Sequence, residues 1–320
     1  MAISRTKIAI VGAGNVGTAL AHQIVIEKLC NTLVLIDLNK DKAWAEATDL
    51  SHSLGYSETK MEVYSGEYED CKDADIVVLA VAAPYKVGMT RLDMLDKAGR
   101  IVSSIVPDVM KSGFNGLFIV ITNPVDAMTY LVQKLSGLPT SRIIGTGTSL
   151  DSARLRYYLA KTMDVDARSV EAMCMGEHGD SQMIPWSQVT VGAKKFTDIM
   201  HDYPERIKDM DLSGISAGIS KVAYKIMENK GATNYGIAAM AVLIIKAVLR
   251  DGNIVLPVSA MLNGEYGESG VYAGVPAIIS SEGVKELVEY HLTEEEEKAF
   301  KASVAVLRDA DKKLCVGLGL

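Results

Sequence analysis

The first 145 residues alternate between short apolar runs rich in β-branched residues and longer segments with helical spacing. The apolar runs are 7-KIAIV-11, 33-LVLID-37, 75-DIVVLAV-81, 117-LFIVIT-122 and 142-RIIGT-146. Between them lie segments such as 16-VGTALAHQIVIEK-28, in which apolar residues recur every three or four positions, as on an amphipathic helix. Strands that are apolar at nearly every position belong in a parallel sheet covered on both faces. This half therefore predicts an α/β fold with a doubly wound parallel sheet.

The pattern changes after about residue 150. Long helical patterns occupy 151–163, 205–228, 233–250 and about 292–312, and shorter β-like runs occupy 168–175, 186–191, 254–262 and 271–279. Residues 60–74 and 261–270 are polar and turn-rich, which predicts surface segments. We expect a first domain at 1–145 and a second, α+β domain with a mixed or antiparallel sheet at 146–320.

The composition argues against several classes of function. The net charge is -7, which argues against nucleic acid or an anionic membrane as the main partner. No apolar run approaches the roughly 18 residues needed to span a bilayer. The four cysteines are far apart and form no CxxC pair, which argues against a metal knuckle and a disulfide framework: Cys30, Cys71, Cys174 and Cys315. We expect a cytoplasmic protein without a bound metal.

A glycine-rich motif, 12-GAGNVG-17, follows the first predicted strand and has the form GxGxxG. Gly12 permits a tight turn, Gly14 lets the backbone approach a pyrophosphate, and Gly17 allows the helix to pack on the strand. Asp37 follows at the end of the second strand, where a carboxylate accepts from two ribose hydroxyls and repels a 2′-phosphate. The motif predicts a Rossmann-type domain that binds NAD in preference to NADP. The alternative is a glycine turn with an unrelated Asp at a strand end.

A second group of residues carries acid-base chemistry. His178 lies between glycines in 176-GEHGD-180, so its backbone can bend and its ring can reach a cleft. Asp151 and Arg154, three residues apart, share one face of a helix. Asp151 can orient an imidazole, and Arg154 can make a planar two-bond contact with a carboxylate. Taken alone, however, a single histidine is more often structural than catalytic, and an Asp–Arg pair on one helix face is more often a surface ion pair.

Family resemblance favours the catalytic interpretation. The motifs GAGNVG, 122-TNPVD-126, 145-GTGTSLDSAR-154, 176-GEHGDS-181 and 231-GATNYG-236 occur in order across roughly residues 5–312. Together they resemble the lactate/malate dehydrogenase family of NAD-dependent oxidoreductases that act on 2-hydroxy acids. The resemblance implies that His178 is the general acid/base, that Asp151 holds its imidazole and that Arg154 binds the substrate carboxylate. It also implies that Arg91 polarises the substrate carbonyl.

The resemblance further assigns contact positions. It places Tyr85, Asn123 and Thr233 at the substrate, and it identifies 81–95 as a loop that closes over the substrate. The implied NAD contacts are Gly12, Gly14, Val16, Gly17, Asp37, Lys42, Tyr68, Ala82, Ala83, Ser104, Thr122, Asn123 and Thr146. The family also implies a homo-oligomer, either a dimer or a tetramer.

Tyr85 departs from the family pattern. Lactate enzymes of the family carry Gln at this position and malate enzymes carry Arg. Without a cation there, the second carboxylate of oxaloacetate would enter a closing site unpaired, which is costly. Ala232 stands where lactate enzymes usually have Tyr, which leaves room beside Thr233. We therefore expect an L-lactate dehydrogenase or a relative that reduces larger apolar 2-oxo acids. The alternatives are a malate dehydrogenase and an NAD-binding sensor or scaffold without turnover; a sensor need not keep all four catalytic residues.

One more departure concerns regulation. Many bacterial lactate enzymes of the family bind fructose 1,6-bisphosphate between subunits through an Arg and a His. Arg156 matches the Arg, but Glu171 occupies the position of the His. A carboxylate repels a phosphate, and it can pair with Arg156 across or within subunits. The sequence therefore predicts little or no activation by this sugar bisphosphate.

Overall fold

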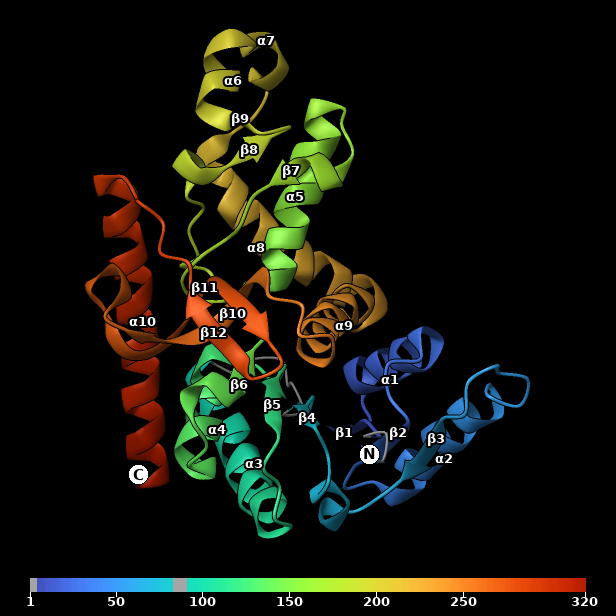
Figure 1. The fold of residues 1–320 in the computed structure, drawn as a ribbon. Coiled ribbons are helices and arrows are strands. Elements are labelled where there is room, and N and C mark those ends of the chain that lie inside the picture. Colours follow the sequence, from blue (N-terminus) through green and yellow to red (C-terminus); the bar gives the residue numbers. More distant parts are fainter. Residues whose placement is uncertain (1–4, 83–90) are drawn as a thin grey trace.

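The structure, a computed structural model, describes residues 5–82 and 91–320. Within these ranges the first half forms a six-stranded parallel sheet in the order β3-β2-β1-β4-β5-β6 (Figure 1). The strands are β1 (Lys7–Val11), β2 (Thr32–Ile36), β3 (Glu62–Ser65), β4 (Ile76–Leu79), β5 (Leu117–Val120) and β6 (Ile143–Gly145). The strand order reverses between β1 and β4, and this reversal is the switch point at which doubly wound sheets bind ligands. The chain therefore has the Rossmann architecture predicted for its first half.

Three strands of the second half extend the same sheet. They are β10 (Ile254–Asn263), β11 (Ser269–Ser280) and β12 (Gly283–Leu287), all antiparallel to their neighbours. Ser259 of β10 pairs with Gly145 of β6 and joins the two parts. Gly145 permits this approach, because a Cβ there would lie 2.3 Å from Thr129 Oγ1 and 2.7 Å from Ser259 Cβ. The runs expected at 254–262 and 271–279 are present as antiparallel strands that continue the first sheet, whereas the runs expected at 168–175 and 186–191 contribute to a separate three-stranded antiparallel sheet.

Helices cover both faces of the sheet. One face carries α1 (Asn15–Glu27), α2 (Lys40–His52) and α9 (Tyr235–Leu249), and the other carries α3 (Arg91–Lys111) and α4 (Val125–Ser136). Alternate residues of β1 point to opposite layers: Ile8 and Ile10 join the first core, and Ala9 and Val11 join the second. Strands buried on both faces require apolar residues at every position, which explains the uninterrupted apolar runs.

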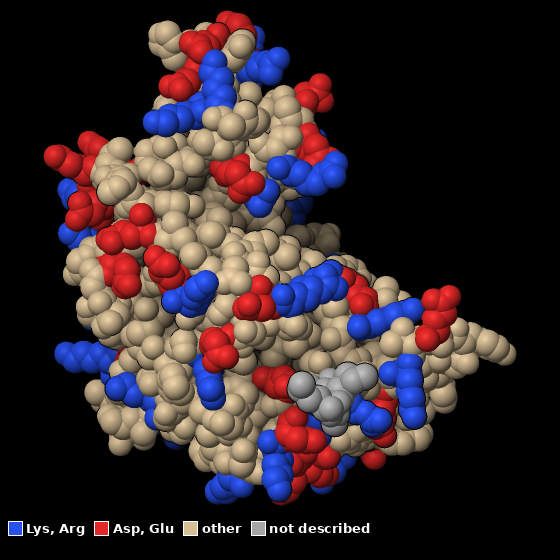
Figure 2. Space-filling view, viewed as in Figure 1, with Lys and Arg blue, Asp and Glu red and all other residues tan. Residues whose placement is uncertain are grey.

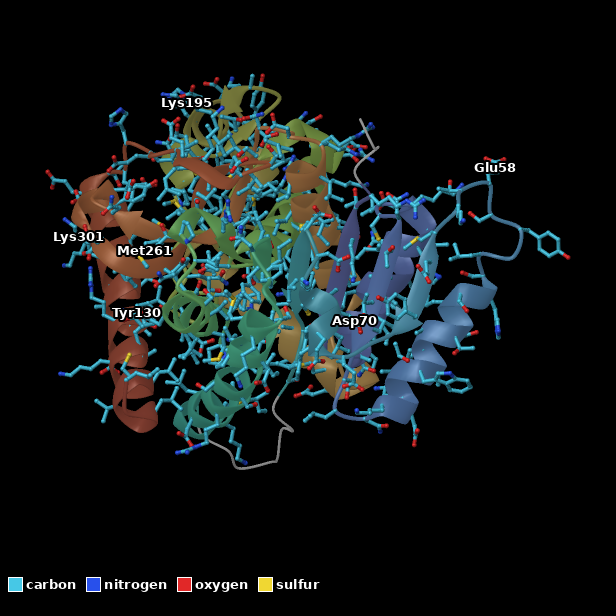
Figure 3. The ribbon with its side chains drawn as sticks, turned by 60° about the horizontal axis from the view of Figure 1, so that its bottom comes forward. Glu58, Asp70, Tyr130, Lys195, Met261 and Lys301 are labelled. Carbon is cyan, nitrogen blue, oxygen red and sulfur yellow. The ribbon has the colours of Figure 1, made fainter. Side chains whose placement is uncertain are left out.

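The long C-terminal helix α10 (Glu294–Leu318) runs beside α3 and α4 (Figure 1). It begins with a capping box, in which the side chains of Thr293 and Glu296 each accept from the backbone N–H of the other. Figure 3 shows Tyr130 of α4 and Met261 of β10 near α10, and both pack against the second core. The helix thus fastens the last part of the chain to the first domain.

The remaining elements form a smaller lobe above the sheet (Figure 1). Its helices are α5 (Ser149–Met163), α6 (Phe196–Asp202), α7 (Pro204–Ile207) and α8 (Leu212–Lys230), and its short strands are β7 (Val170–Glu171), β8 (Thr190–Val191) and β9 (Lys194–Lys195). The lobe has its own apolar core, which includes Leu155, Val170 and Phe196.

Single 3₁₀ turns occur at five places in the described chain: η1 (Tyr68–Cys71), η2 (Thr140–Arg142), η3 (Ala167–Ser169), η4 (Trp186–Gln188) and η5 (Glu265–Gly267).

Some local features differ from expectation. The polar segment 60–74 is mostly exposed or half-buried and includes the turn η1, as expected, but it also contains the edge strand β3, because backbone pairing with β2 does not require an apolar sequence at a sheet edge. The helical pattern at 205–228 divides into α7 and α8, since Asp211 caps a new helix by accepting from Gly214 N at 3.1 Å. Strand β12 had no sequence signal that we recognised.

Acidic and basic side chains are interspersed over the face seen in Figure 2. Such mixing gives no single-sign field on this face to attract a polyanion, in keeping with the net charge of -7. Across the described residues, the structure contains no helix both long and apolar enough to span a membrane.

Candidate active site

The candidate cofactor residues follow the carboxyl ends of neighbouring parallel strands. Gly12 comes directly after β1, Asp37 after β2, Ala82 shortly after β4, Thr122 after β5 and Thr146 after β6. Adjacent parallel strands end at the same edge of a sheet, so these residues share one edge. Backbone contacts between the strand ends tie this edge together, including Thr122 N to Leu79 O at 3.2 Å and Thr146 N to Val120 O at 2.9 Å.

The three glycines of GAGNVG have three different surroundings. Gly12 has φ +111°, and a Cβ there would lie 2.6 Å from Ala80 O. A Cβ on Gly17 would lie 1.8 Å from Gly12 O, so no other residue lets α1 pack this closely on the loop. Gly14 is the N-cap of α1, and a Cβ there would meet nothing within 4 Å. The loop is therefore packed tightly on the protein side and open at Gly14, over the N-terminus of a helix.

Asp37 faces this loop. Its Oδ2 accepts from Ala13 N at 2.7 Å, and its Oδ1 accepts from Asn39 N at 2.9 Å. The carboxylate is thereby fixed beside the glycine-rich turn, 24 residues away in the sequence. An open glycine over a helix N-terminus suits a pyrophosphate, and an anchored carboxylate beside it suits a ribose diol. The residues present fit an NAD molecule.

The other predicted cofactor residues are spread around this edge. Val16 is half-buried in α1, and Lys42 is exposed in the first turn of α2. Ser104 lies on the exposed side of α3 and donates to Ile101 O at 2.8 Å. Tyr68 is half-buried in η1, where burial and nearby carboxylates, Asp37 among them, raise its pKa. Asn123 is exposed, and its side chain accepts from Val125 N at 3.2 Å at the start of α4.

The structure brings His178, Asp151 and Arg154 together. His178 Nδ1 lies 2.6 Å from Asp151 Oδ2, and Arg154 Nη1 donates to Asp151 Oδ1 at 3.2 Å. Asp151 and Arg154 come from the first turns of α5, while His178 comes from the turn after β7. The side chain of Asp151 is 3% exposed, that of Arg154 is 15% exposed and that of His178 is 26% exposed. The carboxylate is buried behind two groups that remain accessible.

The electrostatics of the cluster favour a charged imidazole. Burial opposes the charged form of His178, but the attraction and hydrogen bond of Asp151 outweigh it and raise the pKa of His178. Burial likewise opposes ionisation of Asp151, but His178 and Arg154 outweigh it and lower the pKa of Asp151. Asp151 thus stays anionic while His178 gains or loses a proton. Such a pair can donate a proton to an oxygen and take it back.

Sequence reasoning missed one buried acid in this cluster. Asp126, within the TNPVD motif, accepts from His178 N at 2.8 Å and from Ser259 Oγ at 2.5 Å. The sequence does mark Asp126 as an ionisable residue near the start of a helix that follows a buried strand, and this place is close to the sheet edge where ligands bind. No role was assigned to it because its partners lie 52 and 133 residues away.

Several predicted residues are not placed. Tyr85 and Ala83 lie outside the described residues, and Arg91 begins α3 with its side chain likewise outside them. Thr233 is half-buried in the segment between α8 and α9. Among the described residues, no group of three or more His, Cys, Asp or Glu side chains is arranged to hold a metal ion.

Residues 6–145 match the family described as lactate/malate dehydrogenase, NAD binding domain, and residues 148–315 match the lactate/malate dehydrogenase, alpha/beta C-terminal domain. A curated relative from Bacillus thuringiensis, L-lactate dehydrogenase 3, is 47% identical over 308 residues, covering 96% of this chain and 98% of that protein.

Solved structures are similar in fold. The ligand-bound minor L-lactate dehydrogenase from Enterococcus mundtii has a TM-score of 0.92 and 42% identity, covering 96% of this chain and 98% of that chain. The malate dehydrogenase from Cryptosporidium parvum has a TM-score of 0.90 and 30% identity, covering 97% and 99%. With both family domains matched in order and a histidine–aspartate pair set beside a dinucleotide fold, this chain belongs to the lactate/malate dehydrogenase family.

Proposed function

We propose that this protein is an NAD-dependent L-2-hydroxy acid dehydrogenase that interconverts pyruvate and L-lactate or a larger apolar pair of the same kind. The observation that carries the proposal is the cluster of His178, Asp151 and Arg154, which joins a proton donor to a carboxylate-binding cation. The naming of close relatives as L-lactate dehydrogenases supports the same substrate class.

His178 is the acid/base group in this proposal. Its Nδ1 is engaged by Asp151 at 2.6 Å, which leaves Nε2 for the substrate oxygen. In the reducing direction the imidazolium donates its proton to the carbonyl oxygen, and in the oxidising direction the neutral ring removes the hydroxyl proton. Asp151 holds the ring in place and stabilises its charged form, as a carboxylate does in hydrolase triads.

Arg154 binds the substrate carboxylate. One guanidinium nitrogen donates to Asp151 Oδ1 at 3.2 Å, and the remaining N–H donors of the planar group are available for a two-bond contact. Because Arg154 and His178 share Asp151, the carboxylate and the reacting oxygen of a 2-oxo acid are held in a fixed relation. Arg91 is proposed to polarise the carbonyl from the start of α3.

The glycine-rich loop, Asp37 and the strand ends would hold NAD, which supplies the hydride acceptor or donor of the reaction. The open backbone at Gly14 and the N-terminus of α1 would face the pyrophosphate. Asp37 would accept from the ribose hydroxyls and would repel the 2′-phosphate of NADP. Thr122, Asn123 and Thr146, at the ends of β5 and β6, would line the nicotinamide end.

The residue at position 85 supports a preference for monocarboxylic substrates. Tyr85 supplies no cation, so the second carboxylate of oxaloacetate would be buried without a partner. Pyruvate and longer apolar 2-oxo acids bring no such charge. Similarity to a malate dehydrogenase at 30% identity keeps oxaloacetate as the alternative that must be tested.

The proposal is tested by following NADH absorbance with a panel of 2-oxo acids. The panel contains pyruvate, 2-oxobutyrate, 4-methyl-2-oxopentanoate, phenylpyruvate and oxaloacetate, each measured over a range of concentrations. A monocarboxylate should give the highest kcat/KM. The highest kcat/KM with oxaloacetate would establish a malate enzyme, and NADH binding without any turnover would establish a sensor.

The cellular compartment and the oligomeric state of the enzyme are also part of the proposal. The four cysteines are free, and Cys30, Cys71 and Cys174 are buried, which suits the reducing cytoplasm. The family resemblance supports a homo-oligomer, which sedimentation at several concentrations would measure. Light scattering that gave the mass of one 34.4 kDa chain would contradict the oligomer.

A further inference from the structure

A buried acid lies on the inner face of the C-terminal helix α10. Asp311 is 8% exposed and stands among the other buried side chains of the helix, between Leu307 and Leu314. These two leucines belong to the apolar cores beneath the helix. Leu314 lies directly against α3, because a Cβ on Gly99 would be 2.5 Å from its Cδ1. Asp311 is therefore part of the surface that α10 packs against the first domain.

The carboxyl of Asp311 has no partner that would neutralise it. Within residues 5–82 and 91–320, its side chain forms no ion pair and no hydrogen bond. Arg308, one turn earlier, is the cation that acts on it, but this guanidinium donates to Glu268 Oε2 at 2.7 Å and to Ser269 O at 2.8 Å. A charge buried without a partner is costly, so this site disfavours the carboxylate.

The elements packed against α10 are α3, α4 and β11, and they supply no free cation to this site. From α4, Asp126 adds a second anion within electrostatic range, and the phenol of Tyr130 is near Asp311 and Cys315 (Figure 3). The remaining titratable groups on these sides are engaged elsewhere: Lys134 lies 5.4 Å from the centre of the Tyr130 ring, Asp96 pairs with Arg100 on α3, and Tyr272 of β11 donates to Thr140 O.

These surroundings favour the neutral acid. Burial and, after it, the negative charge of Asp126 raise the pKa of Asp311 to about 8, and Arg308 acts in the opposite direction. Once water reaches it, the same carboxyl titrates near the ordinary value of about 3.9. The docked helix therefore binds more protons than an open one between these two values. Its stability must fall as pH rises through this window and become constant above it.

We propose that Asp311 makes the docking of the C-terminal half of α10, residues 303–318, dependent on pH. The neutral acid allows this half to pack on α3 and α4, and the ionised acid favours an open state in which water reaches the carboxylate. Ser303, in the same half, accepts from Glu177 N at 2.8 Å, so the turn that precedes His178 loosens with the helix. The inference does not depend on the proposed reaction, since the helix opens with or without a substrate.

The test is hydrogen exchange of the full chain, followed by mass spectrometry at about pH 6 and about pH 8 without substrate or cofactor. After correction for the chemical exchange rate at each pH, the exchange reports the opening equilibrium of each peptide. In the wild type, opening of 303–318 should increase by about tenfold or more over this interval, because each pH unit inside the window changes a one-proton equilibrium by about tenfold. The peptide that contains Glu177 should change in the same direction.

Two matched substitutions assign the effect. Asp311→Asn keeps the size of the side chain but cannot ionise, so opening of 303–318 should agree at the two pH values within about threefold. Asp309→Asn makes the same chemical change two residues earlier, at an exposed acid that pairs with Lys313. It should keep the pH dependence of the wild type.

Each contrary result would overturn the inference. Opening in the wild type that does not increase with pH would do so even if Asp311→Asn did not fold. A tenfold increase that persists in Asp311→Asn would assign the effect to another group, and its loss in Asp309→Asn would assign it to the overall charge of α10. A response of α10 without one at the Glu177 peptide would refute the link to the turn. No measurement uses turnover, so the outcome is independent of the proposed function.

Discussion

His178 Nδ1 lies 2.6 Å from Asp151 Oδ2, although the two residues are separated by 27 positions and come from different elements. Asp151 is 3% exposed, so this contact exists in a poorly hydrated place where a charge pair is strong. The Oδ1 atom of the same carboxylate accepts from Arg154 at 3.2 Å. One buried acid therefore orders both groups that would meet the substrate.

The first prediction concerns the pH dependence given by this contact. Asp151 raises the pKa of His178 above its usual value, so the imidazolium persists as pH rises. Reduction of the 2-oxo acid should be constant at low pH and should fall as pH rises through this pKa. Oxidation of the hydroxy acid, which needs the neutral ring, should show the opposite dependence. Asp151→Asn should shift both profiles to lower pH and reduce kcat by about 10²- to 10⁴-fold; unchanged profiles would remove Asp151 from the mechanism.

The second prediction separates chemistry from cofactor binding. His178→Ala should lower kcat by about 10²-fold or more, the usual contribution of a general acid/base. NADH binding, followed by fluorescence titration, should stay within about twofold, because the glycine-rich loop and Asp37 belong to the other half of the chain. A variant that kept more than about a tenth of the wild-type rate would show that another group donates the proton.

The third prediction concerns cofactor choice. Asp37 is anchored by Ala13 N at 2.7 Å and Asn39 N at 2.9 Å and cannot easily turn away from a 2′-phosphate. We expect kcat/KM with NADPH to be lower than with NADH by about tenfold or more, since about 1.4 kcal/mol of repulsion already gives tenfold. Asp37→Asn keeps the acceptor for Ala13 N and removes the charge, so it should reduce the ratio of kcat/KM with NADH to kcat/KM with NADPH. Equal efficiency with both cofactors in the wild type would contradict the role of Asp37.

The fourth prediction concerns Tyr85, which lies outside the described residues. Tyr85→Arg supplies a cation for the second carboxylate of oxaloacetate and should raise the ratio of kcat/KM for oxaloacetate over pyruvate by about tenfold or more. Tyr85→Gln is the matched control, because it changes the side chain without adding charge. It should not raise the ratio. If both variants behaved alike, charge at this position would not set specificity.

The fifth prediction concerns regulation. Arg156 Nη2 lies 3.3 Å from Glu171 Oε1 in the same chain, so the cation expected at the sugar bisphosphate position already has an anionic partner. We expect millimolar fructose 1,6-bisphosphate to change KM for the 2-oxo acid by less than about twofold, whereas allosteric coupling typically gives about 5- to 150-fold. Glu171→His should create sensitivity near pH 6, where the imidazole is charged. A several-fold fall in KM for the wild type would refute this interpretation of Glu171.

The sequence predicted the first domain well because its signals are local. The strands around Ile8, Leu33 and Ile119 had to be apolar throughout, since both faces of the sheet are covered by helices. Gly17 is required by a contact within its own turn, with Gly12 O, whereas Gly12 is required by its positive φ and by the approach of Ala80 after the neighbouring strand β4. The strand β3 was missed because an edge strand needs backbone partners more than apolar side chains. The division of the chain into domains at residue 145 stays a prediction.

For the catalytic cluster, the sequence determined the residue types, and the pairing was inferred from family resemblance. It showed that His178 is flanked by glycines and that Asp151 and Arg154 share a helix face. The tertiary structure showed the ring nitrogen that Asp151 contacts, the depth of that acid and the buried Asp126 behind the turn. Local sequence cannot reveal these features, because burial and charge depend on neighbours that the fold brings from α4, β10 and α10. The strength of a charge depends on the water that these neighbours exclude, and only the folded chain decides that.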